Sequence, residues 1–99
     1  MSVPGGLGKL EDVTPELKAF CNEVKATVEE KVGKKYDVYT AKSYRHQMVQ
    51  GTNYFVKVHV GGDDYIHLRL FEALPCDGQK RELHSIQTNK TESDEIAYF

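Results

Sequence analysis

One apolar stripe limits most strongly what this chain can fold into. Apolar side chains follow the segment Thr14-Pro15-Glu16 at spacings of three and four residues, and the run ends at Gly33. Thr14 is a favourable N-cap, Pro15 suits the first helical position, and glycine is a frequent helix stop, so the pattern predicts one helix over 14–33. An amphipathic helix cannot bury its own stripe, and the rest of the chain must therefore supply a sheet for it to lie on. The residues of the stripe are Leu17, Phe20, Cys21, Val24, Val28 and Val32.

The two clearest strands of that sheet flank a Gly-Gly-Asp-Asp turn at 61–64. In 54–60 and in 65–71 the even-numbered side chains, such as Val56 and Leu68, are apolar and alternate with a second set. Side chains of a strand point alternately to the two faces of the sheet. We therefore expect the even-numbered residues of both strands to face the helix and the odd-numbered ones to face solvent.

Three other segments complete the predicted fold. Residues 36–47 are rich in Tyr, Val and Thr but alternate too irregularly for their faces to be assigned, residues 83–88 are a further strand, and residues 96–99 add a short segment. Residues 1–12 are Gly-rich and are expected to form a flexible N-terminal arm. The prediction is a single α+β domain over 1–99, with one long helix packed across a four- to five-stranded antiparallel sheet.

Composition narrows the function classes. The formal net charge of −2 and the scattered lysines leave no footprint for nucleic acid, and no apolar run is long enough to cross a membrane. The start of the chain has neither the basic residues nor the apolar run of a signal peptide. Two cysteines, Cys21 and Cys76, do not suggest a disulfide framework. We expect a cytoplasmic protein, with Cys21 buried in the helix stripe and Cys76 exposed in a loop.

A catalytic Cys–His pair and a metal site are two alternative kinds of site in this sequence. Cys76 and His84 could act as nucleophile and base, but no motif orients the histidine, so an enzyme is not predicted. His59 and His67 are expected on the solvent-facing side of one hairpin and could meet a metal ion. No third ligand occurs at a useful spacing, so neither a metal nor any other cofactor is predicted.

The segment "QMVQGTN" at 47–53 is unusual for a turn between two strands. Hairpin turns favour Asn, Asp, Gly or Pro, whereas this one carries Met48 and Val49 close to Gly51. The two apolar side chains either tuck into the end of the core or stay exposed for a partner, and the pattern alone leaves both open. Alternate turns of an antiparallel meander lie at the same end of the sheet. The loop at 74–78, which begins with Leu-Pro, should therefore lie beside this tip.

Several motifs, in order along the chain, resemble one family. "QMVQG" is similar to the Gln-Val-Val-Ala-Gly hairpin of the cystatins, and "GTNYFVKVHVGGDDYIHLRLF" at 51–71 resembles the stefins, the intracellular type 1 branch of that family. "PGGL" at 4–7, "TPE" at 14–16, "LP" at 74–75 and the terminal "YF" match as well. The resemblance covers nearly the whole chain and implies a cystatin-like fold.

By this resemblance the chain is expected to be a reversible, tight-binding inhibitor of papain-like cysteine proteases such as cathepsins. Three segments would block the active-site cleft as a tripartite wedge. The N-terminal segment would occupy the non-primed subsites, the hairpin tip would enter the cleft, and the second loop would contact the primed side. The residues implied are Pro4, Gly5 and Gly6, then Gln47, Met48, Val49, Gln50 and Gly51, and finally Leu74, Pro75 and Cys76.

Two positions depart from the family hairpin. Met48 stands where a second valine is common, and Gln50 where a small alanine is common, which bears on affinity and enzyme preference. A non-inhibitory protein-interaction module on the same fold is the alternative, because a fold alone does not fix a function. The resemblance also implies a monomer that can form a domain-swapped dimer by opening the 47–51 hairpin.

Overall fold

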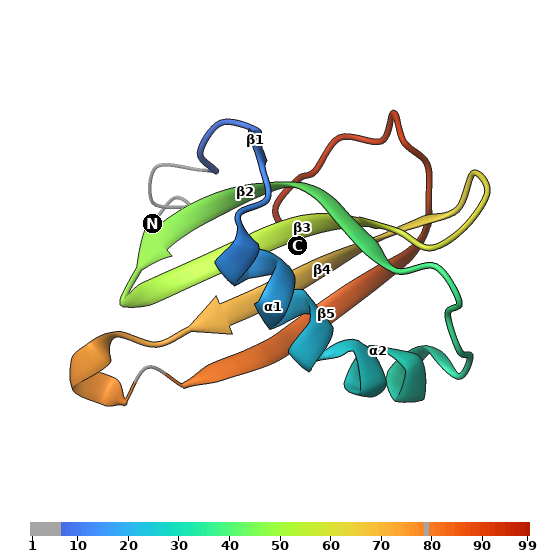
Figure 1. The fold of residues 1–99 in the computed structure, drawn as a ribbon. Helices are drawn as coiled ribbons and strands as arrows, with labels where there is room; N and C mark the ends of the chain where they lie inside the picture. The colour runs from blue at the N-terminus through green and yellow to red at the C-terminus, as the bar shows by residue number, and fades with distance from the viewer. Residues whose placement is uncertain (1–6, 79) are drawn as a thin grey trace.

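The computed structural model describes residues 7–78 and 80–99, and in it one antiparallel sheet carries two helices on one face (Figure 1). The strands are hydrogen-bonded in the order of the chain, β1-β2-β3-β4-β5. This is the α+β, cystatin-like architecture predicted from the sequence. The elements are β1 (Glu11–Asp12), α1 (Pro15–Glu23), α2 (Lys25–Val32), β2 (Thr40–Val49), β3 (Gly51–His59), β4 (Tyr65–Glu72), a 3₁₀ turn (Pro75–Asp77) and β5 (Arg81–Lys90).

The predicted helix begins and ends where the sequence indicated, but it is interrupted. The Leu17 amide donates to Thr14 Oγ1 at 3.1 Å, and Gly33 caps the last turn in the left-handed conformation at φ 85°. At Val24 the backbone leaves helical geometry (φ −94°, ψ 0°), which separates α1 from α2. The prediction of one long helix is therefore wrong in this detail. With this break, α1 lies against β2 and α2 lies against β5.

A β-bulge explains why β2 showed no clear alternation. Ala41 pairs with Val58, but the next pair is Ser43 with Lys57, so one extra residue lies in β2. The bulge shifts the two-residue period by one, and Ala41 and Tyr44, three residues apart, are both buried in the helix-facing core.

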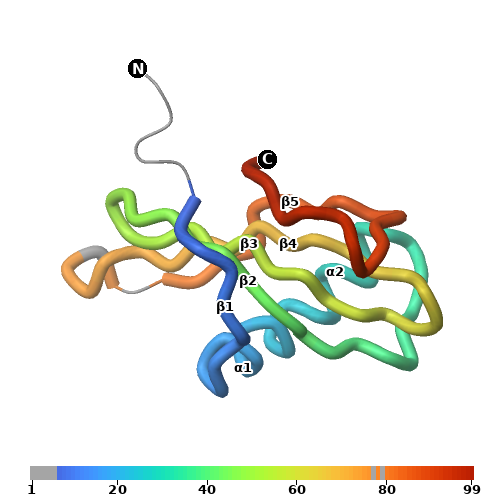
Figure 2. Tube along the Cα trace, turned by 90° about the horizontal axis from the view of Figure 1, so that it is seen from above, coloured from blue at the N-terminus to red at the C-terminus, as the bar shows by residue number. Residues whose placement is uncertain are grey.

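The even-numbered side chains of β3 and β4 form the core as predicted, but much of the odd-numbered face is buried instead of facing solvent. Phe55 and His67 on that face are both 0% exposed. Residues 91–99 turn back after β5 and lie across this face, on the side of the sheet away from α1 (Figure 2). The rings of Tyr98 and Phe99 lie 5.6 and 5.7 Å from that of Phe55. Alternation in a strand cannot reveal a cover that a distant segment supplies. We call residues 91–99 the C-terminal cover.

Three cations on the covered face hold the C-terminal cover by its backbone carbonyls. Lys57 Nζ donates to the carbonyls of Glu92 and Asp94 at 2.5 and 2.6 Å. Arg69 donates to the Phe99 carbonyl at 2.6 Å, and Arg45 donates to that of Ile96 at 2.8 Å. Each bond satisfies a carbonyl in a segment that belongs to no strand, so the cover stays in place without sheet pairing.

Part of the predicted flexible arm is attached to the sheet. Glu11 and Asp12 form β1 and pair with Tyr44 and Ser43 of β2. The Gly8 amide donates to the His46 carbonyl at 2.8 Å. The expectation of a flexible arm over 1–12 is thus corrected for this part of the chain, because the edge of β2 offers free backbone groups. Residues 1–6 lie outside the described residues. No helix within 7–78 and 80–99 has the length and apolar character needed to cross a membrane.

Candidate functional site

The β2–β3 hairpin presents two apolar side chains at one end of the sheet. Val49 pairs with Gly51, and Gln50 alone links the strands. Met48 is 67% exposed and Val49 is 41% exposed, so neither is tucked into the end of the core. Of the two interpretations that the sequence left open, the structure favours exposed apolar side chains. An exposed apolar tip of this kind is typical of a surface that a partner covers.

Gln47 has a different position from the rest of the predicted site. Its side chain is buried, and its Oε1 accepts from Asn53 Nδ2 at 3.1 Å. The two amides face each other across the hairpin, three residues on either side of Gln50. Gln47 therefore braces the root of the tip. The sequence analysis missed Asn53, although its symmetric placement about Gln50 could have indicated the pair.

Gly51 is required by its own neighbours. Its φ of 112° lies in the region that favours glycine, and a Cβ there would lie 2.5 Å from the Glu72 carbonyl oxygen and 2.9 Å from the Phe71 ring. The resemblance to the stefins implied Gly51 only as one of the residues of the hairpin tip. The structure gives an internal reason: the start of β3 lies close against the end of its neighbour β4 here.

The second loop is closed at its base and exposes its apolar start. The Ala73 amide donates to the Lys80 carbonyl at 2.8 Å, and Gly78, at φ 88°, donates its amide to the Pro75 carbonyl at 3.0 Å. Leu74 is 37% exposed, and Pro75 and Cys76 are exposed as well. The loop therefore holds a leucine and a proline toward solvent.

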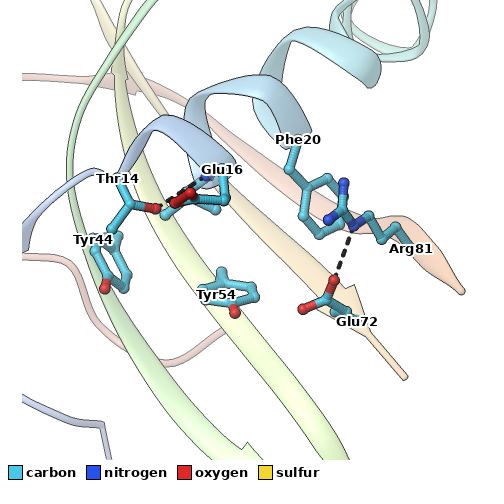
Figure 3. A pocket seen from close by; sticks show the side chains of 8 residues that line it. Thr14, Glu16, Phe20, Tyr44, Tyr54, Glu72 and Arg81 are labelled. Atoms are coloured by element: carbon cyan, nitrogen blue, oxygen red, sulfur yellow. Dashed lines mark hydrogen bonds and ion pairs between the residues drawn. The ribbon is translucent and has the colours of Figure 1, made fainter. Parts of the chain in front are cut away.

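An ion pair fixes the base of this loop to the sheet and to α1. Arg81 Nε lies 2.9 Å from Glu72 Oε2, and its Nη1 lies 3.1 Å from Glu23 Oε2. The guanidinium also lies 5.3 Å from the centre of the Phe20 ring. Figure 3 shows Arg81, Glu72 and Phe20 of this cluster, which line a hollow beneath the start of α1; its volume is about 260 Å³. Because Arg81 already has these partners, we assign the cluster to supporting the loop.

The tip and the second loop lie at the same end of the sheet (Figure 1, left). Thr52 pairs with Glu72, which places the start of β3 against the end of β4, immediately before the loop. The third predicted part, Pro4, Gly5 and Gly6, lies outside the described residues. The first residues that the structure describes, Leu7 and Gly8, contact β2 at Arg45 and His46.

The two cysteines lie in contrasting environments. Both are free thiols, Cys21 buried and Cys76 exposed, as predicted. Burial raises the pKa of the Cys21 thiol to about 12, so this cysteine is unreactive at neutral pH. Cys76 lies in the second loop, among the residues implied for the primed side.

The structure does not place both candidate metal-binding histidines at the surface. His59 bonds to the Gly62 carbonyl at 2.8 Å and packs on Tyr65. His67, expected at the surface, is buried beneath the C-terminal cover. In the part of the chain that the structure describes, no three His, Cys, Asp or Glu side chains gather as metal ligands.

Comparison with known proteins gives a consistent assignment. Residues 5–93 match the family described as Cystatin domain. The chain is 52% identical over 95 residues to cystatin-B of Oplegnathus fasciatus, an alignment that covers 96% of this chain and 95% of the relative. It is 44% identical over 95 residues both to stefin-C of Bos taurus and to leukocyte cysteine proteinase inhibitor 1 of Sus scrofa, again covering 96% of this chain and 94% and 92% of those relatives.

The match to the cystatin family also decides against the enzyme alternative built on Cys76 and His84. His84 instead lies on β5, where its Nδ1 is 2.9 Å from Ser85 Oγ. The fold, the braced hairpin and the sequence matches over nearly the whole length lead to one assignment: the chain belongs to the cystatin family and is a cystatin of the stefin type.

Proposed function

We propose that this chain is a reversible, tight-binding inhibitor of papain-like cysteine proteases of the cathepsin type. A tripartite wedge would occupy the active-site cleft. Met48, Val49, Gln50 and Gly51 form its centre, Leu74, Pro75 and Cys76 contact the primed side, and Pro4, Gly5 and Gly6 reach the non-primed subsites. Gln47 supports the centre from within. The names of the relatives support the class of partner.

The observation that carries the proposal is the exposure of apolar side chains on a braced tip. Met48 is 67% and Val49 41% exposed, while the Gln47–Asn53 pair and the tight contact of Gly51 with β4 hold the backbone below them. A partner that covers these side chains gains the hydrophobic effect. Because the tip is already ordered, little conformational entropy is lost on docking.

Inhibition would follow from occlusion of the cleft. A wedge that fills the substrate site presents no peptide bond to the catalytic cysteine, so the inhibitor stays intact and binding remains reversible. The bulk of Gln50 and the flexible side chain of Met48 then set which proteases the wedge fits best.

We further propose a cytoplasmic location and a monomer that can form a domain-swapped dimer. The location follows from the resemblance to the stefins and from the two free cysteines, which suit a reducing compartment. The alternative function, a non-inhibitory interaction module, predicts no effect on any papain-like protease.

A charge at the tip tests the proposal. Val49→Asp would bury a carboxylate in the cleft without a partner and should weaken inhibition by about 3 kcal/mol, which is on the order of 100-fold in Kd. The measurement is a titration of papain and a cathepsin with the purified protein and the variant.

Val38→Asp is the matched control. Val38 is 40% exposed against 41% for Val49, and it precedes β2, at the other end of that strand. The Val38→Asp protein should inhibit papain and the cathepsin as strongly as the unaltered chain does. Equal potency of the Val49→Asp and Val38→Asp proteins would contradict the wedge. No inhibition by the unaltered chain would favour the interaction module.

A further inference from the structure

Arg45 joins two segments that are far apart in the sequence. It lies on β2, on the face of the sheet that the C-terminal cover occupies, and pairs in register with Phe55. Its Nε donates to the Gly8 carbonyl at 2.7 Å, and its Nη1 donates to the Ile96 carbonyl at 2.8 Å. A longer contact of 3.4 Å runs from Nη2 to the Leu7 carbonyl. One guanidinium thus holds the start of the described chain and the C-terminal cover together.

The two bonds at Gly8 fix that residue from both sides. Its amide donates to the His46 carbonyl at 2.8 Å, while its own carbonyl accepts from Arg45. A Cβ on Gly8 would lie 3.3 Å from the His46 carbonyl oxygen, so a side chain would crowd this contact. Nearby, His46 Nδ1 lies 3.8 Å from Glu11 Oε2.

The anchor on the other side of Arg45 is firm. Ile96 is buried, and the cover that contains it is also held by Lys57 and Arg69. The planar guanidinium spreads five donors over three nitrogen atoms, so Arg45 reaches carbonyls of two different segments from separate atoms, whereas a lysine ammonium concentrates its donors on one atom.

The position of Gly8 decides where the preceding residues can reach. Gly6 is two residues before it, and two residues span at most about 7 Å. Gly8, fixed beside β2, is therefore the point from which the preceding residues would have to reach a bound enzyme. Were the anchor released, these residues would start from a longer tether, and their effective concentration at a bound enzyme would fall.

We propose that Arg45 is a positioning residue for protease binding: it fixes Gly8 against β2 and so sets the point from which Pro4, Gly5 and Gly6 would reach the non-primed subsites of a bound enzyme. This role rests on the proposed function. Arg45 would thus contribute to binding indirectly, in addition to the three segments of the wedge that contact the enzyme.

The experiment compares dissociation from papain for four altered proteins: Arg45→Met, Arg45→Lys, a chain lacking residues 1–6, and that shortened chain with Arg45→Met. Arg45→Met should raise the dissociation rate constant about 10-fold because Gly8 is no longer held in place. Arg45→Lys should recover only part of this. In the shortened chain the same substitution should have no further effect, because the residues whose starting point Arg45 sets are gone.

Lys57→Met is the control, since it releases the C-terminal cover at Glu92 and Asp94 but leaves Gly8 in place. It should dissociate like the unaltered chain. Hydrogen exchange at the Gly8 amide gives a readout without enzyme: it should become faster in Arg45→Met and stay unchanged in Lys57→Met.

The outcomes are distinguishable. Unaltered dissociation of Arg45→Met, or an equal effect of this substitution in the full and shortened chains, overturns the role of Arg45 while the proposed function stands. Absence of inhibition by the unaltered chain overturns both. A rise in dissociation for Lys57→Met as large as for Arg45→Met would assign the effect to the cover as a whole and would also overturn the proposal.

Discussion

At the scale of single residues, the burial of His67 makes the free energy of unfolding depend on pH. Neither ring nitrogen has a hydrogen-bond partner among the described residues, and the side chain is 0% exposed. Burial lowers the pKa of His67 to about 4, and the charges of Lys57 and Lys90 act in the same direction, while Asp94 opposes them. The imidazole is therefore neutral in the folded protein at pH 7 and becomes protonated only as the pH approaches 4.

His67 should make the protein less stable in mild acid. In the unfolded chain a histidine takes up a proton near pH 6.5, whereas in the fold it does so only near pH 4. Between these values the unfolded state binds more protons, so the free energy of unfolding falls as the pH falls, by roughly 3 kcal/mol in all. Urea unfolding at pH 7 and pH 4.5 measures this loss, and His67→Gln should lack most of it.

His84 provides the comparison for that experiment. It is exposed on β5, and His84→Gln should lose stability between pH 7 and pH 4.5 as the unaltered chain does. If His67→Gln loses as much as His84→Gln, another group is responsible for the pH dependence.

At the scale of elements, the β2–β3 hairpin depends on the close approach of Gly51, at the start of β3, to the end of β4. Gly51→Ala would place a Cβ 2.5 Å from the Glu72 carbonyl oxygen in addition to the strain of φ 112°. We expect a loss of about 2 to 4 kcal/mol in the free energy of unfolding. Denaturant unfolding of the variant measures it, and inhibition should fall as well because the tip moves.

Gly61→Ala separates the two contributions. Gly61 has a similar φ of 117°, but a Cβ there would meet only Val38 Cβ at an ordinary 3.9 Å. This variant should lose only about 1 kcal/mol, the cost of the backbone conformation alone. Similar losses for the two variants would mean that the contact with β4 does not constrain the tip.

Those elements that carry local signals were predictable from the sequence. Thr14 and Gly33 bounded the helical region, and alternation assigned the core face of β3 and β4 correctly. The break at Val24 was not predictable, because neither glycine nor proline marks it. The bulge between Ala41 and Ser43 appeared only as missing alternation.

The candidate site shows the same division. The position of the second loop beside the tip followed from the order of antiparallel strands, whereas the exposure of Met48 and Val49 was one of two interpretations that the turn pattern left open. The supports did not follow from these patterns: the Gln47–Asn53 pair, the Arg81 cluster and the bonds of Arg45 each join residues whose proximity arises only in the folded sheet. Local patterns predict which side chains a strand can present, whereas the positioning of those side chains depends on contacts distant in sequence.

At the scale of the whole molecule, the sheet connects segments from both ends of the chain. The tip and the second loop meet through β3 and β4, and Arg45 ties residues 7 and 8 to the C-terminal cover. The hairpin that presents the tip also links two parts of the chain. The first part contains β1, α1, α2 and β2, and the second contains β3, β4 and β5. Opening the hairpin would separate the two parts without changing their internal contacts.

We therefore expect heating to produce a domain-swapped dimer that no longer inhibits. In such a dimer β2 and β3 continue as one long strand, each chain pairs with the other, and the secondary structure is retained. Gly51 would leave its positive φ, and Met48 and Val49 would lie within a strand that spans the dimer instead of at a tip. The dimer fraction, isolated by size-exclusion chromatography after heating, should show native-like circular dichroism and little inhibition of papain. The monomer fraction from the same heated sample is the control and should inhibit fully. A dimer with full inhibition per chain would show that association leaves the tip free and that the hairpin has not opened.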